Sequence, residues 1–195
     1  MDKLSETEKM ANIGDIIKKG NAEERKNTAR IAHYIIARTK SNELGKTKLN
    51  KVLWFADLMH YRRYGVSMTG ATSYTKRQYG PVPNQILAAL GDLEENNIIA
   101  ERMVETPTHP RKEFVWLERP DMINYSSAEV DILHEAIDWI CGNHSAKSIS
   151  DLTHDALWEE IELGKEIPIG AASVIPGEIT EDDMSWAIQE LEKCG

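Results

Sequence analysis

The sequence predicts an α+β fold that is mainly helical and contains one small antiparallel β-hairpin. Three observations lead to this fold class. Apolar residues recur at helical spacing through most of the chain, two short apolar runs separated by a turn indicate a hairpin, and the helix before them gives a winged-helix-like order. The chain has 195 residues, of which 41% are hydrophobic and 28% are charged. This composition and length suit one compact helical domain with a full core.

Two helices are expected before residue 40. A capping-box pattern begins the first helix, and Gly20 is expected to end it. A second capping-box pattern begins a helix over about residues 22–39. We therefore expect residues 1–20 to form an N-terminal helical extension and residues 21–195 to form a single domain that includes a C-terminal helix.

The most apolar stretch of the chain predicts a helix over residues 47–64, with Gly65 in the C-terminal capping position. Apolar residues surround this helix and leave almost no polar face, which is typical of a helix in the middle of a domain. Its consecutive residues Leu53, Trp54 and Phe55 are expected to be largely buried.

The next segment combines an extended run with strong turn signals. Residues 73–79 predict a short extended segment, and the Gly-Pro-Val-Pro run at 80–83 is expected to end it. Because proline suits the first turn of a helix, Pro83 is expected to open a helix that continues to Leu93. The simplest interpretation of the run is a rigid turn that positions this helix.

Residues 98–104 and 113–117 are predicted to be the two strands of the hairpin. A helix followed by such a hairpin has the order of a winged helix-turn-helix, in which the helix enters the major groove and needs positive charge. The stretch 83–97 contains three acidic residues and no Lys or Arg. Phosphate repulsion would oppose docking of that helix, so the sequence argues against nucleic acid as a partner.

The second half of the chain is expected to be helical with one long loop. A capping box begins a helix after Ser126, and residues 148–162 predict one or two further helices. Residues 164–177 contain two prolines and three glycines and are expected to form a loop. A last helix is expected over about residues 180–193.

Charge is distributed unevenly along the chain. The formal net charge is −9, yet residues 46–80 contain seven basic residues against a single acid. Residues 118–195 contain 18 acidic and four basic residues. Two interpretations remain open: both stretches are solvated faces, or the first docks an acidic partner and the second a basic one.

Motifs of common catalytic and cofactor sites are missing from the sequence, which contains no G-x-S-x-G, P-loop, G-x-G-x-x-G or H-E-x-x-H pattern. Asp57 and His60 lie three residues apart, and a hydrogen-bonded pair is a better explanation than a metal site because no third ligand is evident. His154 and Asp155 are better explained by structural hydrogen bonds than by acid–base chemistry. We therefore expect a protein that is not an enzyme and uses neither metal nor cofactor.

The sequence offers no membrane-spanning or secretory signal. No apolar run reaches the length of a spanning helix, and the charged N-terminus lacks the apolar core of a signal peptide. The two cysteines, Cys141 and Cys194, do not make a disulfide framework. We expect a cytoplasmic protein without a membrane partner.

Six short motifs occur in a specific order over about residues 25–170. They are Lys48-Leu-Asn-Lys-Val-Leu-Trp-Phe-Ala-Asp57, Tyr64-Gly65, Thr69-Gly70, Tyr79-Gly80-Pro81-Val82-Pro83, Leu93-Glu-Glu-Asn-Asn-Ile98, and Ser150-Asp-Leu-Thr-His154 with Trp158. Together they resemble the Panacea domain, the SocA-like antitoxin family that also occurs in phage-associated proteins. The residues of this pattern that we expect to be structural are Asp57, Gly80, Pro81, Pro83, His154 and Trp158.

The resemblance implies an antitoxin that neutralises a cognate toxin by direct binding. Two alternatives stay open: an adaptor that delivers a toxin to a protease, and a winged-helix-like transcription regulator. The resemblance also leaves the identity of the toxin and a homo-oligomeric state open. Because Arg and Tyr dominate interface hot spots, we expect an exposed recognition patch of four residues, namely Tyr74, Lys76, Arg77 and Tyr79.

Overall fold

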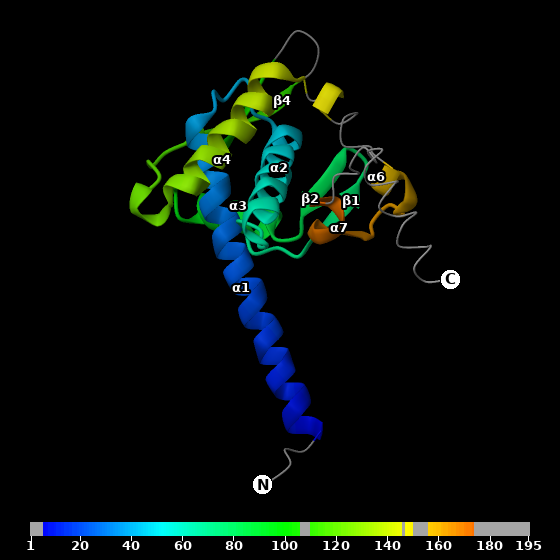
Figure 1. Cartoon of the computed structure of the whole chain (residues 1–195). Coiled ribbons are helices and arrows are strands. Elements are labelled where there is room, and N and C mark those ends of the chain that lie inside the picture. The colour runs from blue at the N-terminus through cyan, green and yellow to red at the C-terminus, as the bar shows by residue number, and fades with distance from the viewer. Residues whose placement is uncertain (1–5, 106–109, 146, 150–155, 174–195) are drawn as a thin grey trace, which may run out of the picture.

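The structure, a computed structural model, describes residues 6–105, 110–145, 147–149 and 156–173. It confirms the predicted fold class, because helices dominate the chain and the strands form only small antiparallel sheets (Figure 1). In Figure 1, α2 (Lys46–Tyr64) lies between α4 (Ser127–Ile137) on one side and the strands β1 (Ser73–Arg77) and β2 (Gly80–Pro83) on the other. Among the described residues, no helix is long and apolar enough to cross a membrane.

The N-terminal helices are a single element. α1 runs without interruption from Glu6 to Arg38, so the predicted break at Gly20 is wrong. A glycine inside a helix costs only about 1 kcal/mol relative to alanine, which the hydrogen bonds of the helix on either side can offset. The N-terminal half of α1 extends away from the rest of the fold in Figure 1. The division of the chain into residues 1–20 and 21–195 stays a prediction.

The central helix matches its prediction. α2 ends at Gly65, which adopts a left-handed conformation (φ 74°) and donates its backbone N–H to the Tyr61 carbonyl at 2.8 Å. Leu53 and Trp54 are buried and Phe55 is half-buried. Because residue 65 is a glycine, it avoids the steric penalty that a Cβ atom has in the left-handed region.

Residues 80–83 form a strand, which corrects the prediction that they end the extended segment and open a helix. β1 (Ser73–Arg77) pairs with β2 (Gly80–Pro83) in an antiparallel hairpin that matches Arg77 to Gly80 and Tyr74 to Pro83. β2 is an edge strand that pairs with β1 on one side only. An edge strand tolerates its two prolines, because proline has no N–H group to donate to the ladder. Gly80 has a positive φ of 126°, which allows the chain to turn after Gln78 and Tyr79.

The predicted loop over residues 164–177 also contains regular structure. β5 (Glu166–Pro168) pairs antiparallel with β1 and completes a three-stranded sheet of order β2-β1-β5. The short helix α7 (Ile169–Ser173) follows it directly. The buried side chains of Ile167 and Ile169 attach this segment to the fold, although its prolines and glycines predict a loop.

The winged-helix-like segment is present as predicted. α3 (Ile86–Glu95) is followed by the hairpin of β3 (Ile99–Val104) and β4 (Arg111–Trp116), which pair in register from Ile99–Trp116 to Val104–Arg111. α3 begins a few residues after Pro83, because that proline belongs to β2.

The remaining described elements are short helices. After the 3-10 turn η1 (Met122–Asn124), the predicted capping box of Ser126 and Glu129 begins α4, which continues into the π-helix η2 (Asp138–Gly142). α6 (Ala156–Glu160) lies in the stretch where further helices are expected. The predicted helix over residues 180–193 lies outside the described residues.

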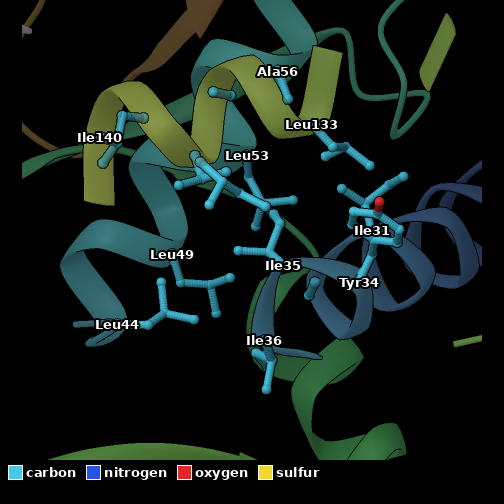
Figure 2. Close-up of a cluster of buried hydrophobic side chains, with 14 of the residues drawn as sticks. Ile31, Tyr34, Ile35, Ile36, Leu44, Leu49, Leu53, Ala56, Leu133 and Ile140 are labelled. Atoms are coloured by element: carbon cyan, nitrogen blue, oxygen red, sulfur yellow. The ribbon is translucent and has the colours of Figure 1, made fainter. Parts of the chain in front are cut away.

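Two groups of buried side chains share α2. The larger group joins α1, α2, α3 and α4, and Figure 2 shows Ile35, Leu53 and Leu133 pointing toward one another from three of these helices. The smaller group connects α2 to the sheet and to α6 and α7. Its members are Trp54, Leu58, Ala71, Tyr74, Trp158, Ile167 and Ile169. α2 therefore organises both sides of the molecule.

Candidate functional site

The turn of the β1–β2 hairpin places two of the four predicted recognition residues on the surface. Arg77 is exposed, and Tyr79 is 63% exposed at the turn itself. Within the described part of the chain, Arg77 has no ion pair or side-chain hydrogen bond. These two side chains remain the candidates for contact with a partner.

Tyr74 is buried, which contradicts its predicted place in an exposed patch. Its ring packs edge-on against Trp54 at 4.9 Å between centroids, and its hydroxyl donates to the carboxylate of Asp57 at 2.7 Å. The side chains of a strand alternate between its two faces, so buried Tyr74 and half-buried Lys76 lie on one face of β1 and exposed Arg77 lies on the other. Tyr74 therefore attaches the hairpin to α2.

Lys76 is half-buried, so it does not provide the free surface charge that the sequence suggests. Its ammonium donates to the backbone carbonyls of Trp158 and Ile161, the latter at 2.7 Å, and lies 4.5 Å from the centre of the Trp158 ring. These contacts bind the end of α6 to β1. Trp158 is buried at this junction, and its predicted structural role stays a prediction.

Asp57 is the centre of a buried hydrogen-bond network. One carboxylate oxygen accepts from the Thr69 backbone N–H at 2.9 Å, and the other accepts from the Thr69 and Tyr74 hydroxyls at 2.5 and 2.7 Å. Burial raises the pKa of Asp57 above its ordinary value, although the hydrogen bonds from Thr69 and Tyr74 act in the opposite direction. The network joins α2, the loop after it and β1.

The predicted pair of Asp57 and His60 is wrong. His60 instead uses Nδ1 to contact the Val66 carbonyl at 2.7 Å.

The pKa of Glu24, which lies near Asp57, is raised, first by burial and then by the charges of Asp57 and Glu166. Even so, no group of three or more potential ligands among the described residues could hold a metal ion.

A pocket opens beside the hairpin, and we call it the hairpin-face pocket. Its volume is about 280 Å³, and it lies between the start of α2, the β1–β2 hairpin and α3. Its lining contains two basic residues, no acidic residue and several apolar ones, and includes Lys46, Thr75, Arg77, Val82, Leu87 and Leu90. An apolar pocket with a basic rim can bind an apolar side chain together with a carboxylate.

Sequence reasoning missed two parts of this pocket. Leu87 is 76% exposed on α3, and Lys46 contributes a charge that Glu101 partly compensates at 2.8 Å. One signal was available for Leu87: it is an apolar residue that falls outside the stripe of Ile86, Leu90 and Leu93. An apolar residue on the polar face of a helix is a candidate contact for a partner.

A protein-family model matches more than half of this chain. Residues 49–159 match the family model described as Antitoxin SocA-like, Panacea domain. The chain belongs to the Panacea domain family. No curated protein and no solved structure matches it.

The matched part of the Panacea domain runs from the first turns of α2 into α6 and includes both hairpins. It thus contains Asp57, the glycine and prolines of β2, and Trp158. His154 also falls in the matched range but lies outside the described residues. Elements beyond the match also pack on the domain: α1, where Arg25 forms an ion pair with Asp92 of α3, β5, which pairs with β1, and α7, whose Ile169 is buried in the smaller group.

Proposed function

We propose that this chain is a cytoplasmic antitoxin that neutralises a cognate toxin by direct protein–protein binding. The observation that carries the proposal is its membership of the SocA-like antitoxin family over residues 49–159. Neutralisation of this kind requires a complementary surface and no catalytic group, because a bound protein can block the active site of a toxin. We accordingly propose that it acts without enzymatic activity.

The turn of the β1–β2 hairpin and the hairpin-face pocket are the proposed docking site. Arg77 and Tyr79 supply the two residue types most often found in hot spots. Arg77 also lines the pocket, next to the exposed side chain of Leu87. The buried Asp57–Tyr74 network holds β1, which carries Arg77 and leads into the turn that carries Tyr79, and this limits the entropy lost on binding.

An acidic surface on α6 and the turn after it is the rival docking face. Glu159, Glu160 and Glu162 are all exposed, while the side of α6 that faces the fold carries the buried Trp158. Such a surface complements a toxin with a basic active site, as expected for toxins that act on RNA or nucleotides.

The decisive experiment uses the reading frame that neighbours the gene of this chain. That frame is expressed alone and together with this chain, and growth is scored. We expect growth arrest from the neighbour alone and rescue by co-expression. Toxin protein is quantified in parallel, because direct neutralisation leaves its level unchanged, whereas delivery to a protease lowers it.

Two sets of folded variants then locate the docking face. Arg77→Glu combined with Tyr79→Ala should weaken toxin binding by about tenfold or more if the hairpin docks. Glu159→Lys, Glu160→Lys and Glu162→Lys together test the acidic face in the same titration, at two salt concentrations. Unchanged affinity in both sets would refute docking through either face. A folded His154→Gln protein that binds toxin but fails to rescue growth would point to chemistry instead.

A further inference from the structure

A second pocket, which we call the Trp116 pocket, lies where the end of α1 meets the end of β4 and η1. Its volume is about 320 Å³, and it is lined by Tyr34, Ala37, Arg38, Trp116, Arg119, Pro120 and Met122. It shares no lining residue with the hairpin-face pocket. It is therefore a separate surface feature of the fold.

The pocket has the composition of an interface hot spot. Trp116 is 41% exposed and Met122 is 45% exposed, although both are large apolar side chains. Leu117 and Ile123 beside them are also exposed. Exposed apolar groups that gather in one place on a soluble protein mark a contact surface, and Trp, Tyr, Arg and Met are the residue types enriched there.

The walls of the pocket are fixed by contacts behind them. The hydroxyl of fully buried Tyr34 contacts His134 Nε2 at 2.9 Å, and Trp116 pairs with Ile99 across the hairpin. The Asp121 carboxylate accepts the backbone N–H of Ile123 at 3.2 Å and thereby stabilises η1. A preformed pocket loses little conformational entropy when a partner binds.

The charge of the pocket selects the partner. Arg38 and Arg119 are both exposed, and neither forms an ion pair or side-chain hydrogen bond within the described ranges. Arg38 stacks on the Tyr34 ring, with its guanidinium 5.6 Å from the ring centre. No acidic residue lines the pocket. Two unpaired guanidinium groups beside an apolar pocket complement carboxylates that flank an apolar side chain.

We propose that the Trp116 pocket is a docking site for an acidic segment of a partner protein, which inserts one large apolar side chain against Trp116 and Met122 and pairs carboxylates with Arg38 and Arg119. The pocket is small, so it accommodates one anchoring side chain rather than a folded surface. The inference rests on the proposed function only in that this chain acts by binding proteins.

The test uses a defined probe and needs no toxin. A fluorescein-labelled acidic pentapeptide with a central phenylalanine between aspartates and glutamates is titrated against the full chain, and anisotropy is recorded. Two control peptides carry alanine at the centre or lysines in place of the acids. We expect the acidic phenylalanine peptide to bind at least about tenfold more tightly than either control.

Variants of the chain locate the binding. Arg38→Gln with Arg119→Gln, and separately Trp116→Ala, should each weaken the peptide by about tenfold or more. Arg63→Gln is the matched control, because it removes an exposed guanidinium that lines neither pocket and should leave the affinity unchanged. Circular dichroism verifies that each variant is folded.

Several outcomes would overturn the inference. They are the absence of binding up to about 1 mM peptide, equal binding of the alanine peptide, and unchanged binding by the double arginine variant. Self-association in sedimentation velocity that the double variant abolishes would assign the pocket to contacts between copies of this chain. Peptide binding without rescue of growth would refute the proposed function alone, and rescue without peptide binding would refute this inference alone.

Discussion

Asp57 is a carboxylate without solvent exposure, and its two oxygens accept hydrogen bonds from Thr69 and Tyr74. Removing an acceptor from such a site leaves buried donors unsatisfied, which costs more than the bonds contribute. We predict that Asp57→Ala lowers the free energy of unfolding by at least about 2 kcal/mol. Asp57→Asn should cost less, because its amide retains an acceptor for the Thr69 N–H. Urea unfolding of both variants measures the difference, and equal losses would contradict a hydrogen-bonding role.

The raised pKa of Asp57 also predicts how stability depends on pH. Because the folded state holds the proton more tightly than the unfolded state, stability is fully present below the ordinary pKa of 3.8 and falls as pH rises through the raised one. We predict that the difference in unfolding free energy between the native chain and Asp57→Asn changes in this sense between about pH 4 and pH 7. A pH-independent difference would show that the carboxyl is ionised over the whole range.

Lys51 should change stability with pH in the opposite direction, and at alkaline pH. Burial lowers its pKa from 10.5 to about 8, so the unfolded chain binds more protons between these values. Stability should therefore rise with pH from about 8 to 10.5, by up to about 3 kcal/mol. We predict that Lys51→Met removes this rise, with Lys46→Met, at an exposed position of the same helix, as the control. Parallel pH profiles for the native chain and Lys51→Met would contradict the lowered pKa.

Single residues could be selected from the sequence, but their partners could not. Asp57 was recognisable as a carboxylate in an apolar helix, yet its hydrogen-bond partners lie 12 and 17 residues further along the chain. Tyr74 has the residue type of a hot spot, and only its burial in the folded chain shows that its side chain points inward. The alternation of a strand defines two faces, and the sequence alone does not decide which face is buried.

At the scale of elements, predictability follows how local the stabilising contacts are. α2 ends at a capping glycine and α4 begins at a capping box, and both signals lie within four residues of the helix end. β2 and β5 depend instead on pairing with β1, and Tyr74 pairs with Ile167, far along the chain. A three-residue strand with a proline carries almost no local signal. Local patterns thus predicted α2, α4 and the β3–β4 hairpin, and missed the three-stranded sheet.

The contact between Lys76 and α6 gives a prediction about an element. Lys76 holds the carbonyls of Trp158 and Ile161, so its loss should release the end of α6 from β1. We predict that Lys76→Met increases hydrogen exchange over residues 156–163 by about tenfold while the exchange of α4 stays unchanged. Arg77→Gln, the exposed neighbour on the same strand, is the control. Unchanged exchange over 156–163 would mean that packing of Trp158 alone holds α6.

The whole molecule is organised around α2, as the apolar pattern of that helix predicts. Leu53 packs in the larger group of buried side chains (Figure 2), and Leu58 packs in the smaller group with Tyr74 and Trp158. Both leucines belong to one rigid helix, so the two groups cannot separate without unfolding α2. This arrangement favours a single cooperative unit, in which loss of packing on either side weakens the whole fold.

Leu53→Ala and Leu58→Ala form a matched pair that tests this cooperativity. The two leucines are 0% and 5% exposed, and the same truncation removes the same atoms from opposite sides of α2. We predict that each variant lowers the free energy of unfolding by about 2–5 kcal/mol. Each should shift one common transition, followed by circular dichroism for the helices. Tryptophan fluorescence follows the Trp54–Trp158 side when Trp116, Trp139 and Trp186 are replaced by phenylalanine in all proteins compared. If Leu58→Ala produced a separate early transition in fluorescence while the helices persisted, the sheet side would be an independent unit, and the docking hairpin would unfold without the rest of the domain.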